Sequence, residues 1–246
     1  MEELLITFII GFLASVLSGI AGGGSGFITS PLFIIMGLPP QVAIATAKFG
    51  ALGIALGGFF TFRKTEFIKW RYVIYLSALA TIASALGSFW LLSLDESTIE
   101  KIVGSLMLIS LPFILLKKDS GLKEVIVTNI AKIIGWFMFF CLAFLQSSFG
   151  SGIGTLIPVV MTNLFGFTIL EANATRKIPG VIIAIVPLIV FMSNSIVDYK
   201  LGFFILAGTY LGSSLGTKIA IKKGNRFAKM VLVIVIVILS IKLLLF

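Results

Sequence analysis

Long apolar runs alternate with short polar connections along almost the whole chain. At a helical rise of 1.5 Å per residue, a run of about 20 residues crosses the roughly 30 Å of hydrocarbon in a bilayer. The runs of that length are residues 4–21, 41–62, 70–93, 99–116, 129–149, 174–196, 199–221 and 227–246. Two further apolar segments, 27–37 and 155–166, are too short to cross as ordinary spans. The pattern predicts an all-α polytopic membrane protein.

A glycine cluster precedes each of the two short segments. The first cluster is Gly22-Gly23-Gly24-Ser25-Gly26, and the second is Gly150-Ser151-Gly152-Ile153-Gly154. Glycine at this density breaks a helix, because it loses backbone entropy on folding and admits positive φ angles. Backbone freed at membrane depth is tolerated only where it is buried in protein or lines a polar cavity. We therefore expect glycine-broken or short helices near the midplane in both halves of the chain.

The two halves repeat each other at an offset of 129 residues. Ala43-x-Ala45-Thr46-x-Lys48 matches Ala172-x-Ala174-Thr175-x-Lys177, and Gly37 matches Gly166. The offset is 128 at the glycine clusters, where Gly22 matches Gly150. Polar identities held in one register indicate an internal duplication. The expected organisation is a first transmembrane repeat at 1–116, a cytoplasmic linker at 117–128 and a second transmembrane repeat at 129–246.

Loop charge predicts how the two repeats are oriented. Basic residues gather in the loops 63–71, 117–123 and 218–226, which the positive-inside rule places in the cytoplasm. The loop 63–71 is the repeat mate of 194–200, which is not basic. Matched loops are therefore expected on opposite sides of the membrane. The charges predict two inverted repeats of about five helical elements each, with both termini extracytoplasmic in a multi-pass protein of the cell membrane.

Composition excludes several classes of function. The chain is 59% apolar and 12% charged, whereas soluble domains are about a quarter charged. It has no histidine and one cysteine, Cys141, so we expect no disulfide framework, no Cys/His metal site and no histidine-dependent catalysis. No catalytic residue, metal or cofactor is expected. The net charge of +9 is attributed to topology and contact with the lipid bilayer, not to nucleic-acid binding.

Inverted repeats with paired, glycine-broken segments are typical of secondary transporters with a site near the bilayer midplane. The N-terminal amides of two broken helices can hold an anion there. The expected substrate-binding residues at the breaks are Gly23, Gly24, Ser25, Gly26 and Thr29 in the first half, and Gly150, Ser151, Gly152, Gly154 and Thr155 in the second. The alternative is that these small residues only allow helices to pack closely.

Two repeat-matched lysines, Lys48 and Lys177, lie inside predicted spans. Buried positive charge is costly in hydrocarbon and usually marks a pathway or a counter-ion site. Acidic residues fall in loops, tails or helix ends, with Glu171 at the edge of a span. We therefore add both lysines, and Thr46 and Thr175 two residues before them, to the expected site, and we expect a small anionic substrate. The alternative is that both lysines extend to the membrane interface along their aliphatic stems.

The motifs resemble those of one known family. The sequence reads S-G-x-x-G-G-G-S-G from Ser18 to Gly26, then has Pro31, then reads G-x-P-P-x-x-A-x-A-T from Gly37 to Thr46; a looser version runs from Ser147 to Pro158. This resembles the sulfite exporter TauE/SafE family of membrane permeases, over essentially the whole chain. The resemblance implies transport of sulfur-containing or organic anions, such as sulfite, sulfoacetate and related sulfonates or carboxylates.

The sequence thus predicts a secondary transporter, and more specifically an exporter, of small anions such as sulfite or organosulfonates. Alternating access at a site between the two repeats is the expected mechanism. The alternatives are an anion channel and a structural membrane subunit of a larger complex. An intramembrane enzyme is disfavoured, because the chain offers no general base, metal set or activated nucleophile beyond lysines and hydroxyls. A homo-oligomer is possible, and the sequence does not determine the oligomeric state.

Overall fold

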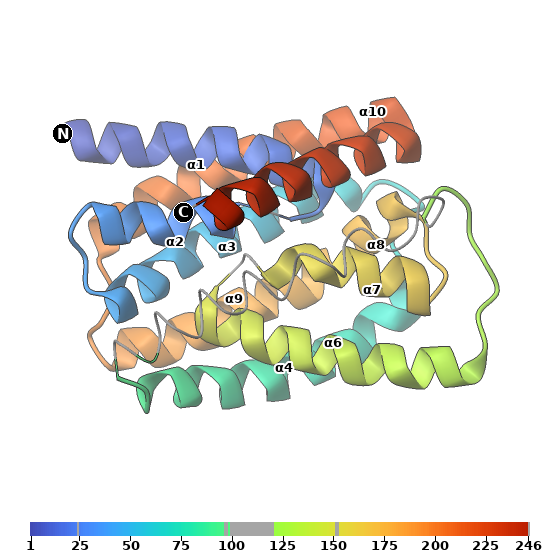
Figure 1. Ribbon diagram of the computed structural model, residues 1–246, viewed down its shortest axis with the longest axis horizontal. Helices are drawn as coiled ribbons and strands as arrows, with labels where there is room; N and C mark the ends of the chain where they lie inside the picture. The colour runs from blue at the N-terminus through green and yellow to red at the C-terminus, as the bar shows by residue number, and fades with distance from the viewer. Residues whose placement is uncertain (24, 96–97, 99–120, 151–152, 246) are drawn as a thin grey trace.

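The computed structural model describes residues 1–23, 25–95, 98, 121–150 and 153–245 (Figure 1), and every regular element in these ranges is helical. The first half contains α1 (Glu2–Ala21), α2 (Gly26–Ile35), α3 (Pro40–Phe62) and α4 (Trp70–Leu92). The second half contains α6 (Asn129–Phe149), the 3₁₀ turn η1 (Ile153–Thr155), α7 (Leu156–Leu164), α8 (Ile169–Thr175), α9 (Lys177–Ser193) and α10 (Tyr199–Leu245). The predicted span at 99–116 lies outside the described residues.

Six helical segments of the described part are long and apolar enough to cross a membrane. They are Glu2–Ala21, Pro40–Phe62, Trp70–Leu92, Asn129–Phe149, Ile169–Ser193 and Tyr199–Ile234. The predicted all-α polytopic class is therefore confirmed. Within α10, Gly224 has φ 82° and ψ 179°, and this non-helical residue separates the predicted runs 199–221 and 227–246.

A repeat-matched glycine with a positive φ angle ends the first long helix of each half. Gly22 ends α1 with φ 87°, and its N–H donates to Ser18 O at 2.8 Å. Gly150 ends α6 with φ 102°, and its N–H donates to Gln146 O at 3.0 Å. L side chains rarely adopt these angles, so both helix ends require glycine. The sequence match between the glycine clusters thus corresponds to a positive φ angle at both helix ends, whereas the ψ angles differ, 8° at Gly22 and -172° at Gly150.

The main helix contacts join one half of the chain to the other. In the first half, α1 and α3 pack against α10; in the second half, α6 and α9 pack against α4. The two sets are repeat-matched, and α3 and α9 also contact each other. Figure 1 shows α1 with α10 along one edge and α4 with α6 along the opposite edge. The structure therefore consists of two bundles, α1–α3–α10 and α4–α6–α9, each built from both halves.

A row of glycines brings α10 directly onto α1. Cβ atoms placed on Gly208, Gly212 and Gly216 would lie 2.3, 2.2 and 2.1 Å from backbone carbonyl oxygens of α1. Small residues at this spacing allow two helix backbones to touch. The matched positions on α4 are Leu79, Ala83 and Gly87, so a glycine is kept at only one of the three. There, a Cβ atom on Gly87 would lie 2.5 Å from Phe144 O of α6.

The basic loops 63–71 and 218–226 lie at one end of the molecule, where hydrogen bonds connect them to Glu124 and to α8. The ammonium group of Lys69 binds Glu124 and Glu171, the latter at 2.7 Å. Leu170 N donates to Asn225 Oδ1 at 2.9 Å, which links α8 to the turn at Gly224. The two carboxylates hold the pKa of Lys69 above its usual value, because they stabilise the ammonium form. In Figure 1 this end is at the right and the N-terminus is at the left.

Labelling of single cysteines tests which end faces the cytoplasm. In a Cys141→Ala background, we expect Asn194→Cys to react with a membrane-impermeant maleimide in intact cells, because the turn before Asp198 lies at the end opposite the basic loops. Lys123→Cys and Lys222→Cys, in two of the basic loops, should react only after permeabilisation. Labelling of Lys123→Cys and Lys222→Cys in intact cells, with protection of Asn194→Cys, contradicts the predicted orientation.

Candidate functional site

The two glycine breaks meet inside the molecule. A Cβ atom placed on Gly23 would lie 2.8 Å from Thr155 Cα, so the first break contacts the second backbone to backbone. Reciprocally, Ser30 Oγ of α2 lies 3.3 Å from the position of a Cβ atom on Gly150. Each break therefore packs against the segment that follows the break of the other half. The two glycine breaks, which the sequence analysis assigned to one binding site, are therefore in contact with each other.

Arg176 bridges the two breaks. This residue lies between α8 and α9, and its Nη1 atom donates to Gly154 O at 2.8 Å and also to Gly22 O. Gly22 is the residue that ends α1, and Gly154 lies in the 3₁₀ turn between α6 and α7. The guanidinium group therefore satisfies one acceptor from each half with charge-assisted hydrogen bonds, which are stronger than neutral ones.

The two repeat-matched lysines are both buried. Lys48 is only 2% exposed, and its Nζ atom donates a hydrogen bond to Gln146 O at 2.7 Å. This carbonyl lies in the last turn of α6, where the helix dipole favours a cation. Lys177 is 4% exposed, and its Cε would be 2.3 Å from a Cβ atom on Gly58 of α3. Neither lysine extends to the protein surface. The structure therefore disagrees with the alternative in which both lysines reach the membrane interface along their aliphatic stems.

A cavity of about 40 Å³ lies beside the breaks. Ser18, Gly22, Gly23 and Ser25 line it from the end of α1 and the first break, and Gln146 lines it from α6. The remaining lining residues are Arg176, Lys177 and Gly180 around the start of α9, and Ala51, Ile54 and Ala55 of α3. One water occupies roughly 10–15 Å³ on this scale, so the cavity has room for about three waters or one small ion. No carboxylate is among its lining residues.

The amide of Gln146 adds an adaptable polar group to the cavity. Its Oε1 atom is buried, and no residue of the described ranges makes a hydrogen bond to it. An amide side chain can turn and present either its acceptor oxygen or its NH₂ donors. Gln146 can therefore serve a bound anion as a donor without a change in the backbone.

Thr46 and Thr175 lie away from the cavity. Asp198 N donates to Thr46 Oγ1, and Lys69 N donates to Thr175 Oγ1, both at 3.0 Å. Each hydroxyl thus holds the backbone just before a long helix, α10 in one case and α4 in the other. Asp198 and Lys69 are themselves separated by the repeat offset of 129, so the two contacts are repeat-matched.

The other expected site residues are distributed as follows. Gly23, Ser25 and Lys177 line the cavity, Gly154 binds Arg176, and Thr155 is buried against Gly23. Gly26 begins α2, Thr29 is buried on α2, and Gly150 ends α6. Gly24, Ser151 and Gly152 lie outside the described residues.

Arg176, Ser18 and Gln146 were not among the binding residues expected from the sequence. Arg176 carries one signal, a second charge beside Lys177 at the start of a long apolar run. Its repeat mate is Ala47, so a comparison of the two halves does not select it. In the ranges that the structure describes, no group of three or more His, Cys, Asp or Glu side chains is placed to hold a metal ion.

Membrane-spanning helices that enclose a cation-lined cavity between two glycine-broken segments define a class of protein, the membrane transporters. Comparison with known proteins agrees with this class. The model of the sulfite exporter TauE/SafE family matches residues 7–243, and the chain belongs to this family.

Curated relatives are similar to this protein over nearly the whole chain. A probable membrane transporter protein of Haemophilus influenzae is 30% identical over 236 residues, which cover 95% of this chain and 91% of the relative. The probable membrane transporter protein YfcA of Escherichia coli K12 is 26% identical over 240 residues, covering 97% and 88%. The sulfite exporter TauE/SafE family protein 3 of Arabidopsis thaliana is 34% identical over 85 residues, which cover 35% of this chain and 18% of that protein. No solved structure is significantly similar to the chain.

An alanine at Gly23 tests the contact between the two breaks. Its Cβ atom would lie 2.8 Å from Thr155 Cα, and backbone cannot move aside as a flexible side chain can. We expect Gly23→Ala to lower the stability of the purified protein by about 1–3 kcal/mol, the usual cost of overpacking. The loss is measured as a drop in the midpoint of thermal unfolding in detergent.

Gly180→Ala is the matched control, because Gly180 lines the same cavity. Its Cβ atom would lie 3.6 Å from Ala55 Cβ, an ordinary contact, and alanine favours a helix over glycine by about 1 kcal/mol. This variant should be at least as stable as the parent protein. Equal stability of Gly23→Ala and Gly180→Ala contradicts the close packing of the two breaks.

Proposed function

We propose that this protein carries small anions across the membrane and binds them in the cavity between the two glycine breaks. The observation that carries the proposal is the pair of cations, Arg176 and Lys177, on the cavity wall. Both ion pairs found among the described residues involve Lys69, so neither of these cations has a carboxylate partner there. Removing a charge from water costs several kcal/mol, and a bound anion offsets that cost.

The size of the cavity supports a compact substrate. About 40 Å³ suits an ion with three or four oxygen atoms, such as sulfite, better than a long organic sulfonate. The name of the family and of the Arabidopsis relative also refers to sulfite. Within the proposed class of small anions, we therefore favour sulfite or a similar oxyanion, with export as the direction of transport.

Inverted repeats and alternating access are the proposed architecture and mechanism. The matched contacts of Thr46 with Asp198 and of Thr175 with Lys69 support the inversion, because they fix the starts of α10 and α4 at opposite ends. The two bundles α1–α3–α10 and α4–α6–α9 would then rock against each other along the contact between α3 and α9. The cavity, with residues from both bundles on its wall, would open to one side and then to the other.

A carboxylate relay for protons has little support in this site. Glu171 lies near the start of the span Ile169–Ser193, and it is bound by Lys69 and by the backbone N–H of Thr168. Efflux down a gradient, or coupling through protonation of the substrate itself, fits the side chains better. An anion channel with the same site is the second candidate. Saturable counterflow in proteoliposomes supports a carrier, and its absence supports a channel.

A panel of anions tests the substrate class. We expect sulfite to raise the midpoint of thermal unfolding of the purified protein more than sulfate, thiosulfate, sulfonates or carboxylates do. A ligand at 100 times its dissociation constant stabilises the folded state by about 2.7 kcal/mol. A chloride salt at equal ionic strength is the control. No shift with any member of the panel would count against a small-anion site.

Replacing Lys177 tests the role of the cavity cations. Lys177→Met keeps most of the side-chain length and removes the charge, so we expect the apparent KM for the anion to rise about ten- to a hundred-fold. Lys48→Met should have a smaller effect, because the Lys48 ammonium group binds Gln146 O and is not on the cavity wall. Uptake into proteoliposomes measures both.

The matched control for this experiment is Lys200→Met, an equal charge change at an exposed residue of α10. It should leave the apparent KM unchanged. An unchanged KM for Lys177→Met, in a variant that folds normally, contradicts the proposed site. Thermal unfolding of each variant shows whether it is folded.

A further inference from the structure

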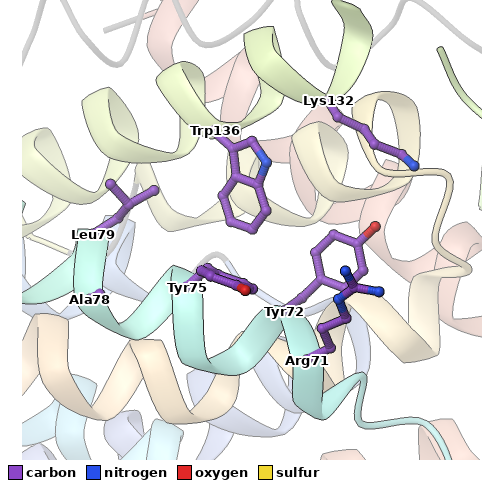
Figure 2. A pocket seen from close by; sticks show the side chains of 7 residues that line it. All are labelled: Arg71, Tyr72, Tyr75, Ala78, Leu79, Lys132 and Trp136. Atoms are coloured by element: carbon purple, nitrogen blue, oxygen red, sulfur yellow. The ribbon is translucent and has the colours of Figure 1, made fainter. Parts of the chain in front are cut away.

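A second, larger depression lies between α4 and α6, outside the site described above. Its volume is about 680 Å³, and Figure 2 shows the side chains that line it. Arg71 and Tyr72 lie near the start of α4, and Lys132 lies near the start of α6. Trp136 contributes its ring from α6, while Tyr75 and Leu79 line the groove from α4. We call this depression the α4–α6 groove.

The α4–α6 groove has a cause in the sequence. Its repeat counterpart is the contact between α1 and α10, where Gly208 lies directly against the backbone of Phe8. The residues matched to this pair are Leu79 and Trp136. A leucine and a tryptophan cannot approach as a glycine and a backbone do, so the same helix pair is held apart at this end. At these matched positions the groove therefore belongs to the α4–α6–α9 bundle, whereas α1 and α10 are in direct contact.

The chemistry of the groove changes along its length. In Figure 2 the guanidinium group of Arg71, the ammonium group of Lys132 and the hydroxyl group of Tyr72 lie toward the same end. Further along, Tyr72 stacks on Trp136 with ring centroids 5.8 Å apart, and Tyr75 meets Trp136 edge-on at 6.0 Å. Neither Arg71 nor Lys132 forms an ion pair among the described residues, and both cations lie beside this aromatic wall.

The surroundings of the groove are apolar and exposed. Ile74 of α4 and Phe137 of α6 are each 69% exposed, and Ile133 is exposed beside them. In a membrane protein such side chains face lipid, whereas tyrosine and tryptophan gather where hydrocarbon meets the headgroups. The groove therefore runs from the headgroup level, at Arg71 and Lys132, toward the acyl-chain region, at Leu79.

We propose that the α4–α6 groove binds an anionic phospholipid from the surrounding leaflet. Its phosphate group would lie between Arg71 and Lys132, within reach of the Tyr72 hydroxyl, and an acyl chain would follow Tyr75, Ala78 and Leu79. Basic pockets between membrane helices hold anionic headgroups in this way. A free phosphate ion would use only the charged end, whereas a lipid also covers the aromatic and apolar wall. The site is independent of the transport cavity and of its substrate.

Lipid binding to matched variants tests the proposal. We compare Arg71→Gln/Lys132→Gln with Lys200→Gln/Lys222→Gln, which removes the same charge from exposed residues elsewhere. Binding of phosphatidylglycerol and of phosphatidylcholine with identical acyl chains is measured by native mass spectrometry of the detergent-purified protein. Phosphatidylglycerol should bind the parent protein and the control equally, and the groove variant more weakly, by about five-fold for each charge removed. Phosphatidylcholine should bind all three weakly.

A third variant separates a lipid site from a phosphate site. Ala78→Trp fills the apolar part of the groove and leaves both cations in place, so it should also weaken binding of phosphatidylglycerol. Equal binding by the groove variant and the control overturns the proposal. The proposal is also overturned if inorganic phosphate, at the same concentration, fully displaces phosphatidylglycerol from the protein.

Light scattering measures the oligomeric state of the same variants. If the parent protein is a dimer that Ala78→Trp dissociates, and lipid binding is unchanged, the groove binds a second copy of the chain instead of a lipid.

Discussion

Breaking two helices inside a membrane frees backbone carbonyl groups that hydrocarbon cannot satisfy, and the rest of this structure depends on how they are satisfied. Arg176 donates to Gly22 O and Gly154 O, one carbonyl from each break. Lys48 donates to Gln146 O at the end of α6. Positive charge is therefore drawn to the breaks by the helix ends themselves. The same arrangement that stabilises the backbone gives the adjoining cavity its positive wall, and in this way fold and proposed anion binding share one cause.

Because helices of one half pack against helices of the other, the two halves of the chain cannot move independently. Because α1 and α3 pack on α10, and α6 and α9 pack on α4, neither half forms a bundle of its own. A movement of one bundle against the other therefore displaces segments of both halves together. Arg176 joins the two breaks at the place where α3 and α9 meet, so its hydrogen bonds must rearrange, or move as a unit, during such a movement.

The sequence was sufficient to predict most of the described helices and a common site for the two glycine breaks, but not all the residues that line the cavity. Hydrophobic runs and glycine clusters are local signals, and they located α3, α4 and α6 to within a residue or two. Thr46 and Thr175 were expected beside the lysines, yet residues two apart in a helix point to nearly opposite sides. Their hydroxyls instead bind backbone at the two ends. Arg176 was missed because its partners, two carbonyls far away in the chain, depend on the tertiary fold.

Departures from the repeat then matter more than the repeat itself. Two equivalent inverted halves would give inward- and outward-open states of equal free energy, with no preferred resting state. At one end Lys69 binds Glu124 and Glu171. At the matched position the Asp198 carboxylate accepts a hydrogen bond from Leu201 N and forms no ion pair among the described residues. A partly exposed ion-pair network of this kind contributes on the order of 1 kcal/mol, or about a five-fold change in a two-state population. If the halves are inverted as proposed, these pairs bias the protein toward closure at the basic end. Under the proposed inversion and alternating access, asymmetric residues on a symmetric frame would set which side of the membrane the cavity faces at rest.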